Sequence, residues 1–154
     1  MTKIRTACLA LLGFFLLLPA LGHAQSVIDK RQQIMEDNDE ANKAIRAALK
    51  EKDYATIEAK AKLIADSMGP DLLNLFPKGS LSEKSEAHPD IWTKWDQFTK
   101  DLTKVRDVAE SLRKAAAAKD DAEVSAQVKA MGGLGSGACG GCHLSFNKKR
   151  MKKI

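Results

Sequence analysis

The chain has 154 residues, of which 29% are charged and 5% are aromatic, and its formal net charge is +5 at pH 7. This length allows one small domain with a single hydrophobic core. The basic charge does not indicate a nucleic-acid-binding protein, because no basic patch with interleaved aromatic residues accompanies it.

The N-terminus predicts a secretory signal peptide over residues 1–24. Lys3 and Arg5 give a positively charged start, an apolar run follows from Leu9 to Leu18, and Gly22-His23-Ala24 provides a small-x-small cleavage site. The run is too short to indicate a transmembrane span. We therefore expect a periplasmic protein, residues 25–154, with no membrane span after cleavage. The signal carries two basic residues and no acid, so its removal lowers the net charge from +5 to +3.

Two amphipathic helices are predicted between residues 27 and 68. The first has a stripe that repeats every three or four residues. Its members are Val27, Arg31, Ile34, Asn38, Ala41, Ile45 and Ala48. The second begins after Asp53, which is the expected N-cap. Its apolar face consists of Tyr54, Ile57, Ala61, Ile64 and Met68. Gly69-Pro70 ends or kinks this helix, and residues 71–76 add a short turn.

Two further helices are expected after a polar loop over residues 77–89. The third begins at Pro89-Asp90, and its apolar positions follow heptad spacing. They are Ile91, Trp95, Phe98, Leu102, Val105, Ala109, Leu112 and Ala116. Asp120-Asp121 caps a fourth helix that continues through Met131. Six glycines between Gly132 and Gly141 then loosen the chain, and residues 144–153 are expected to resume as a helix.

These segments predict an all-α fold. Four amphipathic helices with short connections and no strand-like run are typical of an antiparallel up-down four-helix bundle. No carboxylate pair, Ser/His/Asp set or phosphate-binding glycine loop stands out in the sequence, so we expect no enzymatic activity.

Five residues near the C-terminus, Cys139-Gly140-Gly141-Cys142-His143, form the attachment sequence of a c-type haem. Each thiol can add to one vinyl group of the porphyrin, and His143 can offer a nitrogen to the iron. Cys8 leaves with the predicted signal, so the mature chain keeps only these two cysteines. The motif predicts one haem c, attached covalently near the C-terminal end of the bundle.

Two other uses of a Cys-x-x-Cys pair remain as alternatives. A thiol–disulfide exchange site is expected at the start of a helix in a βαβ unit, and this sequence has no strand-like run. A zinc site needs one or two further ligands. Outside the motif, the mature chain offers only one other histidine, His88, and no other cysteine.

Several further motifs occur in an order that identifies a family. They are Arg31-Gln32 with Met35, then Leu75-Phe76-Pro77-x-Gly79-Ser80, then Pro89-x-Ile91-Trp92-x-x-Trp95-x-x-Phe98, and finally Cys139-x-x-Cys142-His143 with Phe146. In this order and spacing the chain resembles the class II c-type cytochromes, meaning cytochrome c′ and its low-spin relatives. The resemblance covers the whole predicted mature chain and implies the same four-helix bundle.

The resemblance implies that Arg31, Gln32 and Met35 contact the haem. An arginine on the apolar stripe of a helix needs a partner for its charge, and haem propionates match a guanidinium well. The alternative is an Arg31 side chain that extends to the helix edge and reaches solvent. Met35 falls on the distal side of the haem in the family.

Met35 separates two functions. In the low-spin relatives a methionine sulfur is the sixth iron ligand, which raises the reduction potential, whereas cytochrome c′ members leave that position vacant. Met35 is the only soft donor that the resemblance places there, which favours ligation. Many cytochrome c′ sequences also carry a basic residue four positions after the haem histidine, where this chain has Asn147. This departure favours electron transfer over gas binding at the proximal face.

The sequence therefore predicts a periplasmic mono-haem cytochrome that transfers electrons to or from redox partner proteins of the periplasm. Its iron ligands are His143 and Met35. The main alternative is a gas-binding protein with five-coordinate iron that takes up nitric oxide or carbon monoxide. A thiol oxidoreductase is the more remote alternative, and a homodimer is left open.

Overall fold

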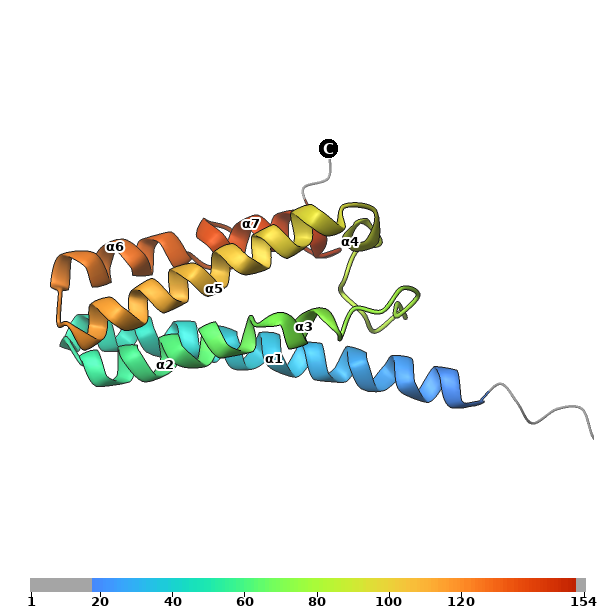
Figure 1. Cartoon of the computed structure of the whole chain (residues 1–154), viewed down its shortest axis with the longest axis horizontal. Helices are drawn as coiled ribbons and strands as arrows, with labels where there is room; N and C mark the ends of the chain where they lie inside the picture. Colours follow the sequence, from blue (N-terminus) through green and yellow to red (C-terminus); the bar gives the residue numbers. More distant parts are fainter. Residues whose placement is uncertain (1–17, 152–154) are drawn as a thin grey trace, which may run out of the picture.

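Two layers of antiparallel helices make up the computed structural model, which describes residues 18–151 (Figure 1). One layer holds α1 (Leu18–Glu51) and α2 (Tyr54–Ser67). The other holds α5 (Trp95–Ala117), with α6 (Asp121–Met131) and α7 (Gly137–Phe146) beside it. The fourth helix of the bundle is thus divided into α6 and α7. The short helices α3 (Pro70–Leu73) and α4 (Asp90–Thr93) flank the loop that joins the two layers. The expected all-α four-helix bundle is confirmed.

The proposed signal peptide stays a prediction. Residues 1–17 lie outside the described part of the chain, and α1 begins at Leu18 and runs without a break past the expected cleavage site after Ala24. Between residues 18 and 151, no helix is both long and apolar enough to cross a bilayer.

The turns at one end of the bundle share a local design. Lys52 and Lys119 have positive φ angles of 54° and 55°, which reverse the chain direction. The next residue in each case is an N-cap aspartate. The carboxylate of Asp53 accepts a hydrogen bond from the backbone N–H of Thr56 at 3.1 Å, and that of Asp120 accepts one from Glu123 at 3.0 Å. Both predicted N-caps are confirmed, and these short turns make the joined helices antiparallel.

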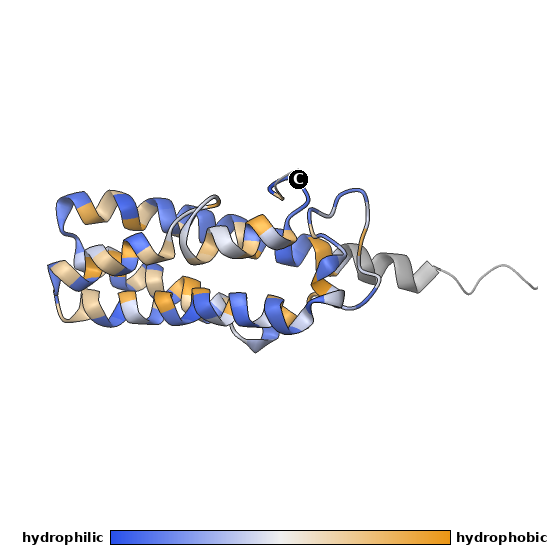
Figure 2. Ribbon diagram, turned by 90° about the horizontal axis from the view of Figure 1, so that it is seen from above, coloured by the Kyte–Doolittle hydropathy of each residue, from blue (hydrophilic) through white to orange (hydrophobic). Residues whose placement is uncertain are grey.

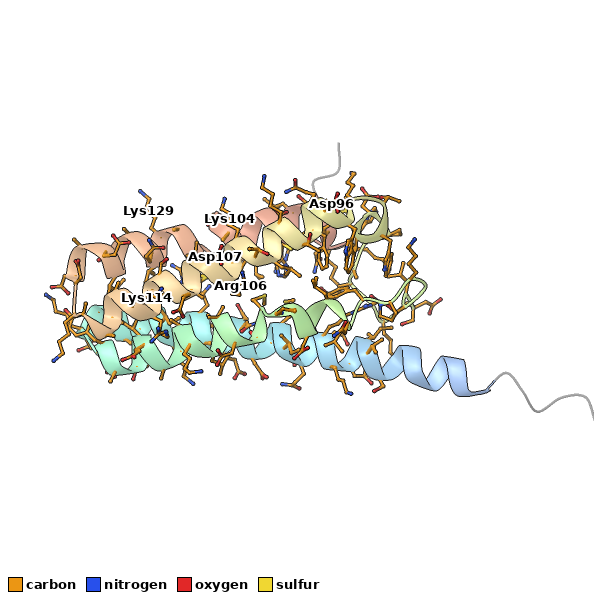
Figure 3. The ribbon with its side chains drawn as sticks, in the orientation of Figure 1. Asp96, Lys104, Arg106, Asp107, Lys114 and Lys129 are labelled. Carbon is orange, nitrogen blue, oxygen red and sulfur yellow. The ribbon has the colours of Figure 1, made fainter. Side chains whose placement is uncertain are left out.

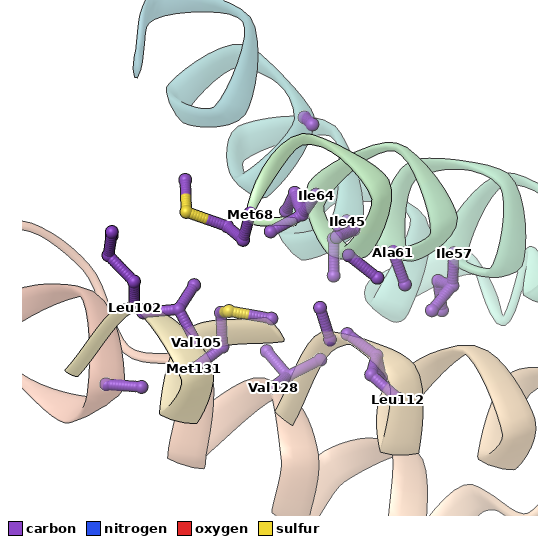
Figure 4. Close-up of a cluster of buried hydrophobic side chains, with 14 of the residues drawn as sticks. Ile45, Ile57, Ala61, Ile64, Met68, Leu102, Val105, Leu112, Val128 and Met131 are labelled. Carbon is purple, nitrogen blue, oxygen red and sulfur yellow. The ribbon is translucent and has the colours of Figure 1, made fainter. Parts of the chain in front are cut away.

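The apolar stripes meet in the centre of the bundle. Figure 4 shows Ile45, Ile57 and Ile64 facing Leu112 and Val128 across the two layers. The predicted heptad positions of α5 are buried from Phe98 to Ala116. Charged side chains such as Lys104, Lys114 and Lys129 are exposed on the outside of α5 and α6 (Figure 3). The hydropathy colouring of Figure 2 shows the same division between the inside and the outside of the helices.

Two helix predictions need correction. The third helix is not continuous from Pro89, because Lys94 (φ −121°, ψ 42°) separates α4 from α5. The backbone N–H of Lys94 still donates to Asp90 O at 2.8 Å, so the break is a kink of one residue. It accompanies a tertiary contact in which Trp92 Nε1 donates to Phe76 O at 2.8 Å. This hydrogen bond holds α4 against the loop that follows α3, so α4 does not continue straight into α5.

The prediction of a helix over residues 144–153 is wrong beyond Phe146. α7 already contains the cysteine motif and ends at Phe146, and Asn147 is extended (φ −106°, ψ 120°) and pairs with Ala87 in an isolated antiparallel bridge. The backbone N–H of Lys148 donates to Glu86 O at 2.8 Å. Because this backbone bonds with a distant loop, it does not continue the helical hydrogen-bond pattern. Residues 152–154 lie outside the described part.

The packing predicts a marked difference between two leucines. Leu112 is fully buried, whereas Leu63 is 37% exposed. Leu112→Ala leaves a cavity in the core and is expected to lower the free energy of unfolding by about 2–5 kcal/mol. Leu63→Ala is the control and is expected to cost less than half as much. Urea unfolding followed by circular dichroism measures both, and equal losses would contradict this description of the core.

Candidate functional site

A cavity of about 280 Å³ lies between α1, the loop before α4, α5 and α7. It approaches the lower end of the ~300–1,000 Å³ range of small-molecule pockets. Its walls include residues from all four predicted motifs: Arg31, Gln32, Met35, Phe76, Phe98, Cys142, His143 and Phe146. A second cavity of about 60 Å³ is lined by Met35, Cys139, Cys142 and His143, among others. The structure therefore brings all six predicted site residues to one end of the bundle.

Helical spacing explains how α7 presents its motif. Cys139, Cys142 and His143 stand at positions i, i+3 and i+4 of one helix, which places their side chains on the same face. Two thiols and an imidazole therefore project together toward the cavities. The sequence pattern alone identified the motif but not this helix.

Glycines build the start of α7 by allowing close backbone contact. Gly132 and Gly137 have φ angles of 68° and 64°, in the region that only glycine adopts freely. A Cβ atom on Gly140 would lie 2.6 Å from the carbonyl carbon of Gly135, whereas one on Gly141 would meet no atom within 4 Å. The glycines therefore form a tight turn that packs against the helix. The expectation that they loosen the chain around the motif is wrong.

Helix α1 holds this turn in place. Asn42 Nδ2 and an Arg46 guanidinium nitrogen both donate to the carbonyl of Gly132, at 2.9 and 2.6 Å. This carbonyl belongs to the last residue before the turn, so the contact fixes the position from which α7 begins. α1 therefore sets the distance between Met35, which it carries, and the motif on α7.

Burial keeps the titratable groups of the motif uncharged. Burial raises the pKa of Cys139, and it raises that of Cys142 to about 12, so both thiols are protonated at neutral pH. A thiol–disulfide exchange site requires a thiolate, so this environment disfavours that alternative. The pKa of His143 is lowered, chiefly by burial, which favours the neutral imidazole that a metal ligand requires.

The site fits a covalently held haem. His143 Nδ1 is buried and has no hydrogen-bond partner within the described residues, so this histidine has unused bonding capacity. The side chains of Phe76, Phe98 and Phe146 give the cavity apolar walls, with ring centroids 4.9 Å apart for Phe76–Phe98 and 5.4 Å for Phe98–Phe146. No three His, Cys, Asp or Glu side chains gather into a metal site anywhere in residues 18–151. The zinc alternative therefore finds no ligand set there.

Arg31 is the one buried arginine of the described chain, with 4% of its surface exposed. It does not reach solvent at the helix edge. Its guanidinium donates to Leu75 O, to the carbonyl and hydroxyl of Ser80 and to Ser85 Oγ, at 2.6–3.2 Å. It also lies 4.9 Å from the centroid of the Phe76 ring. All these partners are uncharged, so a positive charge remains at the cavity wall. Its contact with haem propionates stays a prediction.

The loop over residues 74–89 is fastened from two sides. Arg31 binds it from α1, and Gln32 Nε2 donates to Lys84 O at 2.9 Å. From the other side the backbone N–H of His88 donates to Phe146 O at 2.8 Å, and Lys148 Nζ donates to Ser85 O at 3.0 Å. The loop therefore forms a wall of the cavity that bridges α1 and the C-terminal segment. The sequence motif Leu75–Ser80 pointed to this loop but not to its partners.

Two glycine substitutions test the packing of the motif helix. Gly140→Ala is expected to lower the free energy of unfolding by about 1–3 kcal/mol, because the new methyl group would overlap the backbone of Gly135. Gly141→Ala has open space and is expected to raise stability by about 0.5–1 kcal/mol, since alanine favours a helix interior. Urea unfolding measures both changes. Equal effects at the two positions would show that α7 does not pack on this turn.

Comparisons of sequence and of fold relate this chain to known proteins. A family model described as Cytochrome C′ matches residues 26–147. Cytochrome c′ of Pararhodospirillum photometricum is 30% identical over 128 residues, which cover 80% of this chain and 98% of that protein. Cytochrome c-554 of Cereibacter sphaeroides is 38% identical over 89 residues, or 56% of this chain and 61% of that protein. A mutant of cytochrome c prime from Alcaligenes xylosoxidans, solved as its nitric oxide complex, has the same fold, with a TM-score of 0.70 at 20% identity over 81% of this chain and 95% of that one.

Proposed function

The chain belongs to the cytochrome c′ family, a family of c-type cytochromes with covalently attached haem c, and we propose that it transfers single electrons in the periplasm. In this proposal the iron ligands are His143 and Met35, and the protein has no catalytic activity of its own. It exchanges electrons with periplasmic redox proteins. The observation that carries the proposal is that Met35 and His143 line the same two cavities, from α1 and α7.

The residues of this chain would divide the work of holding the cofactor. Cys139 and Cys142 anchor it by thioether bonds, and the neutral ring of His143 offers a nitrogen to the metal. Arg31 and Gln32 stand at the wall of the larger cavity, where the Arg31 charge suits the haem propionates. The aromatic side chains of Phe76, Phe98 and Phe146 keep water away. When bound, the haem supplies an iron that takes up and releases one electron.

Met35 supports electron transfer through the chemistry of its side chain. A thioether favours ferrous iron, so a bond from Met35 would raise the reduction potential and would keep other ligands from the iron. Met35 is half-buried, and it belongs to a helix whose position against α7 is fixed by the contact of Asn42 and Arg46 with Gly132. Met35 and His143 would therefore both be placed to serve as ligands of the bound iron.

The second candidate function is the binding of a diatomic gas. It is favoured by the smaller cavity of about 60 Å³, which borders Met35 and would admit a small molecule if the sulfur does not bind iron. The cytochrome c prime from Alcaligenes xylosoxidans is a related fold for which a nitric oxide complex of a mutant is known. The two functions differ in whether the sixth coordination position is filled.

The thioether attachment predicts the behaviour of the cysteine variants. Acid-acetone treatment of the denatured protein is expected to leave the colour with the polypeptide, because covalent bonds hold the haem. Cys139→Ala combined with Cys142→Ala should release it to the solvent. A double variant that still holds its colour after extraction would refute attachment through these two thiols.

Replacing Met35 distinguishes the two functions. If its sulfur binds iron, the native oxidised protein is low-spin, and Met35→Ala becomes high-spin, has a lower reduction potential and binds carbon monoxide. Met68→Ala is the matched control. Met68 also lines the smaller cavity, but it lies at the end of α2 and not on α1, so its loss should destabilise the fold without changing the spin state. Visible spectra of both oxidation states measure the outcome. A native protein that is already high-spin would reject Met35 ligation and favour gas binding.

A further inference from the structure

The smaller cavity borders the haem-attachment motif and also contains polar side chains that have no assigned part in holding the haem. It lies between α1, α2, α5 and α7, and most of its lining is apolar, including Ile64, Met68, Leu102 and Val105. Asn38, Asp39 and Asn42 of α1 also line it. The carboxylate of Asp39 pairs with Lys43 Nζ at 2.6 Å. The two asparagines therefore need a separate explanation.

Each asparagine has a buried atom without a hydrogen-bond partner. These atoms are Asn38 Nδ2 and Asn42 Oδ1, and the two residues are only 9% and 8% exposed. Asn38 and Asn42 are one helical turn apart, so both side chains lie on the same face of α1. An amide buried without partners opposes folding, and buried polar groups in proteins are normally satisfied by protein atoms or ordered water.

The existing bonds restrict how each amide can be turned. Asn42 Nδ2 donates to Gly132 O at 2.9 Å, so its orientation is fixed and its oxygen is left over. Asn38 Oδ1 lies 2.9 Å from Ser67 Oγ, and this hydroxyl can instead donate to Ile64 O, also at 2.9 Å. Turning the Asn38 amide would therefore let its nitrogen donate to Ser67 Oγ, but its oxygen would then be left without a partner. In either orientation, each amide needs one more partner.

We propose that the smaller cavity holds a buried water molecule that bridges the amides of Asn38 and Asn42. The cavity volume of about 60 Å³ exceeds the roughly 10–15 Å³ that one water molecule requires. Water both donates and accepts, so it satisfies the pair in either orientation of Asn38. An ion would gain less, because both amides are neutral and the nearby carboxylate already has a cationic partner.

The position of this water gives it a role in the redox site. The cavity is also lined by Cys139, Cys142 and His143, so the water dipole lies next to the attachment motif. Water makes the surroundings of the motif more polar, and a more polar environment favours the more positively charged, oxidised state of the cofactor, which lowers its potential. The inference rests on the haem-attachment motif and not on the proposed bond from Met35.

A double-mutant cycle tests the bridge in the haem-loaded protein. The described contacts include no direct hydrogen bond between Asn38 and Asn42, so coupling stronger than that of two neighbouring side chains on one helix requires a shared water. Asn38→Ala and Asn42→Ala are each expected to raise the unfolding equilibrium constant roughly ten-fold. The double variant is expected to raise it several-fold less than the product of the two, because the second change removes a bridge that is already lost.

Ile34 with Asn38 provides the matched control cycle. This pair has the same spacing on α1, but Ile34 has no polar side-chain atom. The combined Ile34→Ala and Asn38→Ala variant is therefore expected to raise the unfolding equilibrium constant by the product of the two single effects, to within about two-fold. Independent effects of Asn38 and Asn42, or equal coupling in both cycles, would overturn the proposal. Failure of Met35 ligation would appear instead in the spin state and would leave this coupling unchanged.

A high-resolution crystal structure of the haem-loaded protein gives the direct readout. Electron density within hydrogen-bond distance of both amides is expected, and it should be absent in Asn38→Leu, whose apolar side chain fills the space. That variant should also have a higher reduction potential, whereas the exposed Gln33→Leu on the same helix should not. A cavity filled by the haem itself, or an unchanged potential after loss of the water, would overturn the proposal.

Discussion

Close backbone packing at Gly140 is the constraint on which the site depends. One face of α7 carries the two cysteines and His143, and the neighbouring face at Gly140 lies against the turn at Gly133 and Gly135 with no room for a side chain. The helix can therefore approach the turn only where it lacks a Cβ atom. That contact decides which face of α7 points to the cavities. Since the turn itself is held by Asn42 and Arg46, the direction of the motif depends on α1.

The buried charge of Arg31 organises the opposite wall. A guanidinium without a carboxylate partner must satisfy its donors with carbonyl and hydroxyl oxygens, and the loop over residues 74–89 supplies them. In doing so Arg31 positions Phe76, whose ring it contacts and which is part of the aromatic wall. The positive charge is thus both a structural anchor for the loop and an electrostatic feature of the cavity.

The two ends of the bundle differ in how they are built. At one end, two short turns with a lysine in positive φ and a capping aspartate join consecutive helices by local interactions alone. At the other end, the long loop, the C-terminal segment and α1 are joined by contacts between residues far apart in sequence. The first arrangement gives a stable scaffold, and the second leaves space within it for a large cofactor.

The sequence by itself determined the helices, two of their caps and the identity of the cofactor-binding motif. Heptad spacing and a local carboxylate-to-backbone bond act within a few residues, and the Cys-x-x-Cys-His order carries its chemistry in the covalent structure. Only the tertiary structure decided that the motif lies on a helix, that Gly140 packs on Gly135, and that Arg31 binds Ser80 and Ser85. It also ended α7 at Phe146, because Lys148 bonds with Glu86 across a long sequence separation. Such contacts depend on which segments meet in space, and no local pattern encodes them.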